Sequence, residues 1–224
     1  MTGTIVNTGA VVAGSLIGLA AGKRLPERMK KLLLQCLGLS TLLIGLQMAL
    51  SGKELMAVIA CLLLGAIIGE GVNLERWIER LGEWLKTKAR SGSSTFVEGF
   101  VTSSLLYVTG AMVIVGSIQD GVAGDPRTLY IKAMLDGVAS IALASTLGPG
   151  VLFSALSVFA VQGSLTLLAS RLVFLQAPAV LDAVTATGGL LIVAIGINLL
   201  ELTKIRIGNL IPALVLAILW GAWK

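Results

Sequence analysis

Long apolar runs constrain this chain more than any other feature of its sequence. A helix needs about 20 mostly apolar residues to cross a bilayer. Eight runs of roughly that length occur, at residues 4–22, 34–51, 55–72, 96–118, 129–147, 150–170, 180–200 and 205–223. Only 13% of the residues are charged and the mean hydropathy is +0.94, whereas soluble domains average about 25% charged residues. The sequence therefore predicts an all-α integral membrane protein with about eight transmembrane helices, forming one polytopic domain over residues 1–224.

The residue types that commonly bind metals and redox groups are scarce. The chain has no histidine, and its two cysteines, Cys36 and Cys61, both lie inside apolar runs. Zinc, haem and iron–sulfur sites depend on these residues, so we expect no metal and no cofactor. There is also no His-Glu-x-x-His sequence and no Gly-x-Ser-x-Gly nucleophile turn. We therefore expect that the protein is not an enzyme.

The basic residues indicate a topology rather than a nucleic-acid partner. The net charge is +5, but lysine and arginine gather in short loops beside the apolar runs. The loops after the first, third and seventh runs hold about twelve of them, and the opposite side holds four. Because basic loops stay in the cytoplasm, we expect a multi-pass protein of the inner, or plasma, membrane with both termini outside. Its environment is the lipid bilayer, and no nucleic acid is expected as a partner.

The segment between the third and fourth runs has the pattern of an amphipathic helix. Over residues 74–88, leucine, isoleucine and tryptophan recur at helical spacing, and acidic and basic residues alternate on the other face. The two tryptophans, Trp77 and Trp84, favour a helix lying in the membrane interface. A helix that docks a partner is the alternative.

Two parts of the chain resemble each other. The glycines of residues 38–47 align with those of residues 189–198, each segment having two glycines seven apart followed by an amide, and Gly14-Ser15-Leu16 aligns with Gly163-Ser164-Leu165. This alignment pairs the first three runs with the last three and the fourth with the fifth. Matched runs then cross the membrane in opposite directions, which predicts an inverted repeat. One repeat has three runs followed by one, the other has one run followed by three, and inverted repeats are a common transporter architecture. Repeat one covers about residues 4–118 and repeat two about 129–223.

Glycine pairs four residues apart also occur in the first and third runs. Gly14, Gly18 and Gly22 share a face of one helix, and Gly65 and Gly69 share a face of another. Small residues at this spacing let helices approach closely in lipid. We expect them to pack within the chain rather than form a dimer seam, although the pattern leaves a homo-oligomer open.

Two carboxylates begin matching apolar segments within the fourth and fifth runs. Glu98 is followed by Gly-Phe-Val-Thr and Asp136 by Gly-Val-Ala-Ser. Charges within a bilayer are costly and usually face a cavity or a partner. Oxygen-rich groups suit protons or hard cations. The residues predicted to bind the ion or substrate are Glu98, Thr102, Lys132, Asp136, Ser140, Asn198 and Asn209.

Structural explanations exist for the same residues. Lys132 and Asp136 are one helical turn apart, so they can neutralise each other as an ion pair that moves nothing. Glu98 lies near the predicted cytoplasmic boundary and can be interfacial. The functional hypothesis is a transporter of a small ion or solute with a central acidic site at the repeat interface. A passive channel and a non-transporting scaffold or sensor acting through residues 74–88 are the alternatives.

Several motifs along the chain resemble one known family. They include Glu98-Gly99-Phe100-Val101-Thr102, Lys132-Ala133-Met134-Leu135-Asp136-Gly137 and Asn209-Leu210-Ile211-Pro212-Ala213. In these motifs the chain is similar to the bacterial multispanning proteins grouped as domain of unknown function 554, and the resemblance covers nearly its whole length. It implies a bacterial inner-membrane protein, sometimes described as a transporter. It implies no substrate and no catalytic residues.

Overall fold

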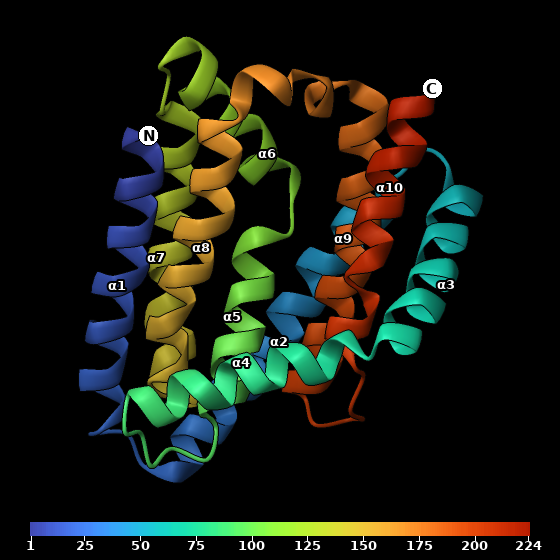
Figure 1. Cartoon of the computed structure of the whole chain (residues 1–224). Helices are drawn as coiled ribbons and strands as arrows, with labels where there is room; N and C mark the ends of the chain where they lie inside the picture. The colour runs from blue at the N-terminus through green and yellow to red at the C-terminus, as the bar shows by residue number, and fades with distance from the viewer. The chain divides into compact units, whose positions relative to one another are not determined.

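The computed structural model describes all residues, Met1–Lys224, and is entirely helical (Figure 1). Three short 3-10 turns and one π turn interrupt the α-helices, and no strand is present. The all-α class predicted from the apolar runs is therefore confirmed. The α-helices are α1 (Thr2–Gly22), α2 (Glu27–Leu50), α3 (Leu55–Val72), α4 (Leu74–Lys88), α5 (Phe96–Val108), α6 (Ala111–Ile118), α7 (Arg127–Leu147), α8 (Gly150–Leu167), α9 (Pro178–Leu199) and α10 (Pro212–Trp223).

Six helices are long and apolar enough to cross a membrane, namely α1, α2, α3, α7, α8 and α9. The fourth predicted run is bent: α5 and the segment from Ala111 to Ala123 meet at 59°, and counting this pair as one span gives seven. The bend lies at Gly110, whose φ of +151° is readily adopted only by glycine. The chain is thus a multi-pass helical membrane protein with six to seven candidate spans.

The eighth predicted run forms a shorter helix than expected. A 3-10 turn occupies Ile207–Leu210, and α10 begins only at Pro212. Proline lacks the backbone N–H that a helix interior requires but fits the first helical turn. Residues Ile207–Trp223 therefore form an apolar segment below the length of the six full spans.

The chain divides into two compact units, each assembled from distant parts of the sequence. Unit 1 contains residues 1–37, 79–108 and 112–172, and unit 2 contains residues 38–78, 109–111 and 173–224. Neither unit is a continuous stretch, because each combines helices from the first half of the chain with helices from the second half.

In unit 1, α1 packs along α7 and α8, and α5 packs against α8 and α7 (Figure 1). The glycines of α1 allow a close approach to α7. A Cβ on Gly14 would lie 2.2 Å from the carbonyl oxygen of Gly137, and one on Gly18 would lie 2.3 Å from that of Ile141. The glycine spacing seen in the first run therefore serves packing within the chain.

In unit 2, α9 packs against α10 and α3, α10 packs against α3, and the second half of α2 contacts α9. Four glycines make the α2–α9 contact in two pairs. A Cβ on Gly38 would lie 3.3 Å from the carbonyl oxygen of Gly196, and one on Gly45 would lie 2.8 Å from that of Gly189. Low residue numbers on α2 thus meet high numbers on α9, so the two helices run antiparallel.

Helix α4 occupies the segment predicted to be amphipathic. Its Leu85 is buried in a small apolar cluster with Phe96 and Phe100. Trp77 and Trp84 point elsewhere and are 61% and 55% exposed. The helix therefore has one side packed on the protein and an uncovered aromatic side.

Candidate functional site

A buried ion pair on α7 is the core of the candidate site. Lys132 and Asp136 are four residues apart, so their side chains lie on the same face of the helix. The Lys132 ammonium bonds the Asp136 carboxylate, and the two side chains are only 7% and 10% exposed. A buried ion pair is not a strong stabiliser, because removing both charges from water costs free energy that their attraction offsets only in part.

Amides from two other helices extend this pair into a network. Asn7 on α1 donates from Nδ2 to Asp136 Oδ2 at 3.0 Å and to Gln162 Oε1 on α8 at 2.9 Å. Gln162 Nε2 in turn lies 3.4 Å from the hydroxyl of Thr4, which bonds the hydroxyl of Thr166 at 3.2 Å. Residues far apart in the sequence thus form one polar chain across α7, α1 and α8.

A fourth helix contributes through Tyr107 near the end of α5. Its hydroxyl lies 2.8 Å from the hydroxyl of Ser140, one turn beyond Asp136 on α7. The Lys132 ammonium is 6.0 Å from the centre of the Tyr107 ring, within reach of a cation–π interaction. Tyr107 is almost fully buried, so it forms one wall of the candidate site.

One acceptor in this network has no partner. The Asn7 side chain is completely buried, and its Oδ1 makes no hydrogen bond although its Nδ2 makes two. Buried polar atoms are almost always bonded, so an orphaned acceptor calls for an explanation such as a water, an ion or a ligand. An amide oxygen beside a carboxylate is chemically suited to a hard cation or to a donor group.

The structure brings together only some of the residues predicted for the site. Lys132, Asp136 and Ser140 share the buried network described above. Glu98 is exposed in the first turn of α5. It precedes Tyr107 by nine residues, or about 13 Å along a helix rising 1.5 Å per residue. Thr102 is buried on the same helix between them.

Asn198 and Asn209 belong to unit 2 and bond their local surroundings. Asn198 closes the loop after α9, donating to the carbonyl of Ile205 and accepting from its N–H, both at 2.8 Å. Asn209 accepts from the N–H of Glu75 and donates to the Glu70 carboxylate, both at 2.7 Å. Both amides therefore hold chain segments in place, an arrangement that their positions in the sequence did not reveal.

Two members of the network could have been selected from the sequence. Asn7 and Gln162 are isolated amides inside apolar runs, which is a recognisable signal. Tyr107 carries no such signal, because a tyrosine in a hydrophobic helix is ordinary. No group of three or more histidine, cysteine or acidic side chains comes together at a common point.

Comparison with known proteins identifies the family. Residues 2–222 match the family described as Protein of unknown function (DUF554). The chain belongs to this family. DUF554 is therefore the family whose motifs the sequence resembles.

Two relatives extend the DUF554 relationship over nearly the full length. The chain is 32% identical over 220 residues to the Uncharacterized membrane protein YdfK of Bacillus subtilis (strain 168), covering 96% of this chain and 93% of that protein. It is 28% identical over 230 residues to the Uncharacterized protein YqgA of Escherichia coli (strain K12), covering 99% and 98%. No solved structure matches.

Proposed function

We propose that this protein transports a small ion or solute across the bacterial inner membrane and that the network around Asp136 is its central site. The observation that carries the proposal is the buried Lys132–Asp136 pair bonded to Asn7, whose Oδ1 is left unpartnered. Ionisable groups within membrane helices are costly and commonly mark ion or substrate pathways. No chemical transformation of the substrate is part of this proposal.

The charge arrangement supports a change of partners at Asp136. In one state the carboxylate is neutralised by Lys132, and in the other it faces the transported species while Lys132 turns toward the Tyr107 ring and the Ser140 hydroxyl. A site that exchanges one partner for another couples binding to a conformational change, since each partner favours a different arrangement. Glu98 and Thr102 then belong to α5, which also carries Tyr107 of this site, whereas Asn198 and Asn209 hold chain segments within unit 2.

An inverted repeat is part of the proposal, and the glycine contacts of unit 2 support it. The sequence alignment pairs Gly38 with Gly189 and Gly45 with Gly196. Under this alignment, the equivalent of the Gly38–Gly196 contact is a contact between Gly189 and Gly45. The structure contains both contacts. Self-matching contacts of this kind are what a two-fold relationship between antiparallel helices produces.

The helix neighbours of unit 1 agree with the same repeat. The alignment matches α1 with α8 and the bent α5–α6 pair with α7. In unit 1, α1 packs on α7 and α8 packs on α5, which are equivalent contacts under this matching. The network around Asp136 lies among these helices, in keeping with transporter sites located where inverted repeats meet.

The membrane arrangement completes the proposal. The α5–α6 pair and the short α10 segment add to the six full spans to give eight crossings, with both termini outside. Helix α4 lies in the cytoplasmic interface, where the exposed Trp77 and Trp84 rings contact the headgroup region. The same uncovered face is the one observation that favours the alternative of a scaffold or sensor.

The experiment is a flux screen on the full-length protein in liposomes with monovalent cations, protons and small anions. Its main variant replaces the pair with apolar residues, Lys132→Met with Asp136→Leu, because this removes both charges without leaving one unpaired. Glu201→Gln is the control, since that carboxylate is exposed. We expect at least a tenfold loss of flux in the double variant and none in the control.

Equal flux in the wild type and the folded double variant would remove Asp136 from the mechanism. Single-channel currents far above transporter turnover would instead select the passive channel. If deletion of residues 74–88 abolished the cellular phenotype and the double variant kept it, the scaffold would replace the transporter.

A further inference from the structure

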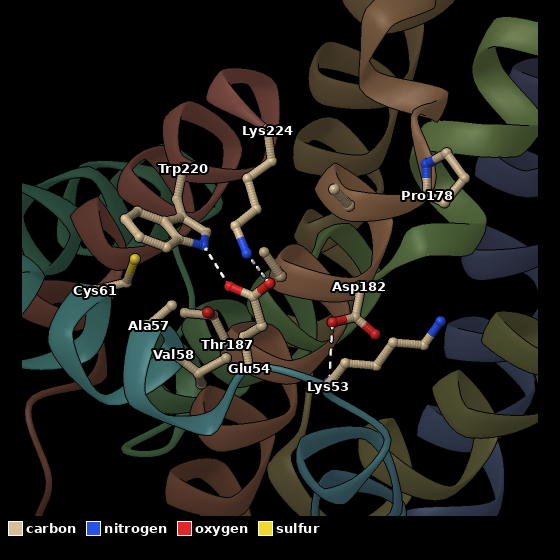
Figure 2. A pocket seen from close by; sticks show the side chains of 12 residues that line it. Lys53, Glu54, Ala57, Val58, Cys61, Pro178, Asp182, Thr187, Trp220 and Lys224 are labelled. Atoms are coloured by element: carbon tan, nitrogen blue, oxygen red, sulfur yellow. Dashed lines mark hydrogen bonds and ion pairs between the residues drawn. The ribbon is translucent and has the colours of Figure 1, made fainter.

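Unit 2 contains a cavity that is separate from the Asp136 network. Its volume is about 200 Å³, and it lies between the beginning of α3, the beginning of α9 and the end of α10 (Figure 2). A cavity of about 150 Å³ already accommodates benzene. The space is thus large enough for a molecule of roughly eight heavy atoms.

The mouth of the cavity carries two positive and two negative side chains. Glu54 bonds the Lys224 ammonium and accepts from the Trp220 indole at 3.1 Å (Figure 2). Asp182 accepts from the backbone N–H of Lys53 at 3.0 Å through Oδ2. The Lys53 side chain is exposed, and its ammonium group is not used in this contact. The four formal charges cancel, which favours an occupant with no net charge.

The inner part of the cavity is apolar apart from one hydroxyl. Its walls include Ala57, Val58 and Ala183, and Thr187 lies deeper along α9 (Figure 2). Thr187 is fully buried, and its Oγ1 has no hydrogen-bond partner. A buried hydroxyl without a partner is costly, so its presence on the wall indicates that the occupant supplies a polar atom at this depth.

We infer that this cavity binds a small hydroxyl-bearing α-amino acid as a zwitterion. The ligand carboxylate pairs with the Lys53 ammonium, and the ligand ammonium pairs with the Asp182 carboxylate. The side chain enters the apolar part and its hydroxyl bonds Thr187. Asp182 and Thr187 both line the cavity from α9, five residues and about 7.5 Å of helix rise apart.

This inference goes beyond the proposed function and does not depend on it. The binding residues lie in unit 2 and the Asp136 network lies in unit 1. The chemistry is also different, because the cavity selects a neutral zwitterion with a hydroxyl whereas the network holds a single buried ion pair. Equilibrium binding therefore tests the cavity without requiring transport.

The first experiment measures equilibrium binding of radiolabelled L-threonine to the full-length protein in lipid nanodiscs. L-Valine is the critical competitor, because it has the shape of threonine and lacks the hydroxyl. A site built to bond a hydroxyl rejects the analogue that lacks it. Two further competitors are 3-hydroxybutyrate, which lacks the ammonium, and 1-amino-2-propanol, which lacks the carboxylate. We expect saturable threonine binding, and we expect valine and both of these analogues to compete at least tenfold more weakly than unlabelled threonine.

The second experiment uses variants that separate recognition from folding. Lys53→Met should weaken threonine binding at least tenfold, while Lys23→Met, at an exposed lysine of unit 1, should not change it. Thr187→Val should abolish the preference for threonine over valine, because the hydroxyl that distinguishes them is gone. Asp182→Asn should weaken threonine binding and narrow its advantage over 3-hydroxybutyrate, because the carboxylate that pairs with the ligand ammonium is gone.

Several results would overturn the inference. They are the absence of saturable threonine binding, equal competition by valine, or unchanged binding in Lys53→Met. A co-purified phospholipid that occupies the cavity and is not displaced by threonine would do the same. Threonine binding without any flux would leave this inference intact and count against the proposed transporter. Ion flux without threonine binding would support the transporter and overturn this inference.

Discussion

Gly45 and Gly189 hold α2 and α9 in backbone contact, because a Cβ added to either would lie 2.8 Å from the carbonyl oxygen of the other. The reciprocity means that neither residue can be enlarged without moving a helix. Lipid offers no hydrophobic drive for helix association, so close backbone approach is a main source of packing energy in this environment. The contact therefore matters both for stability and for the proposed repeat.

The first prediction concerns this contact. Gly189→Ala should destabilise the protein by about 1–3 kcal/mol, as overpacking does in well-packed cores, since the new methyl would also lie 2.4 Å from the backbone nitrogen of Ala49. Gly71→Ala is the control, because nothing lies within 4 Å of that position. Unfolding in mixed detergent micelles measures both, and an unperturbed Gly189→Ala variant would contradict the packing described.

The second prediction separates the two charges of the buried pair. Asp136→Asn leaves the Lys132 ammonium buried without its counter-ion, and breaking such a pair costs about 3–5 kcal/mol. Lys132→Met with Asp136→Leu should recover most of that loss, because no charge remains and Asn7 keeps its bond to Gln162. Unfolding curves of the single and double variants provide the comparison. A double variant as unstable as the single one would show that the network, not the charge, is decisive.

The third prediction concerns the acid at the start of α3. Hydrogen bonds from Lys224 and Trp220 lower the pKa of Glu54 below its ordinary value of 4.5. A carboxyl with a lowered pKa in the folded state adds stability above its unfolded pKa, and that stability is lost as the pH falls through the folded pKa. The Trp220 fluorescence, measured with the other tryptophans changed to phenylalanine, should therefore titrate with a midpoint below 4.5.

A matched variant tests the cause of that pKa shift. Lys224→Met removes the interaction that lowers the Glu54 pKa most, so the fluorescence midpoint should move up toward the ordinary value. Lys23→Met, at an exposed lysine of unit 1, should leave it in place. The same midpoint in the Lys224→Met and parent proteins would exclude Lys224 as the cause.

The fourth prediction concerns Asn209, which joins three chain segments in unit 2. Asn209→Leu removes the acceptor for the Glu75 N–H and the donor to Glu70. Both hydrogen bonds are partly buried, and one such bond contributes about 0.5–1.5 kcal/mol, so the variant should unfold at lower denaturant. Because the Glu70 side chain also bonds Arg206 at 2.6 Å, Arg206→Met provides an exposed comparison that should cost less.

Much of the fold followed from local pattern alone. Apolar runs predicted helices at six full-length positions, and the glycine spacing of α1 and α3 indicated close packing within the chain. Local sequence is informative here because every backbone polar group in a lipid environment must be bonded within its own helix. The eighth run was overestimated, since Pro212 limits where α10 can begin.

The candidate site depended on contacts that no local pattern encodes. The spacing of Lys132 and Asp136 predicted their ion pair, because helix geometry fixes neighbours four residues apart. Only the tertiary structure decided that Asn7 and Gln162 join that pair, that Tyr107 bonds Ser140, and that Thr187 lines a cavity with Lys53 and Asp182. Such groupings arise from how helices distant in sequence pack, and packing depends on shape across many residues at once.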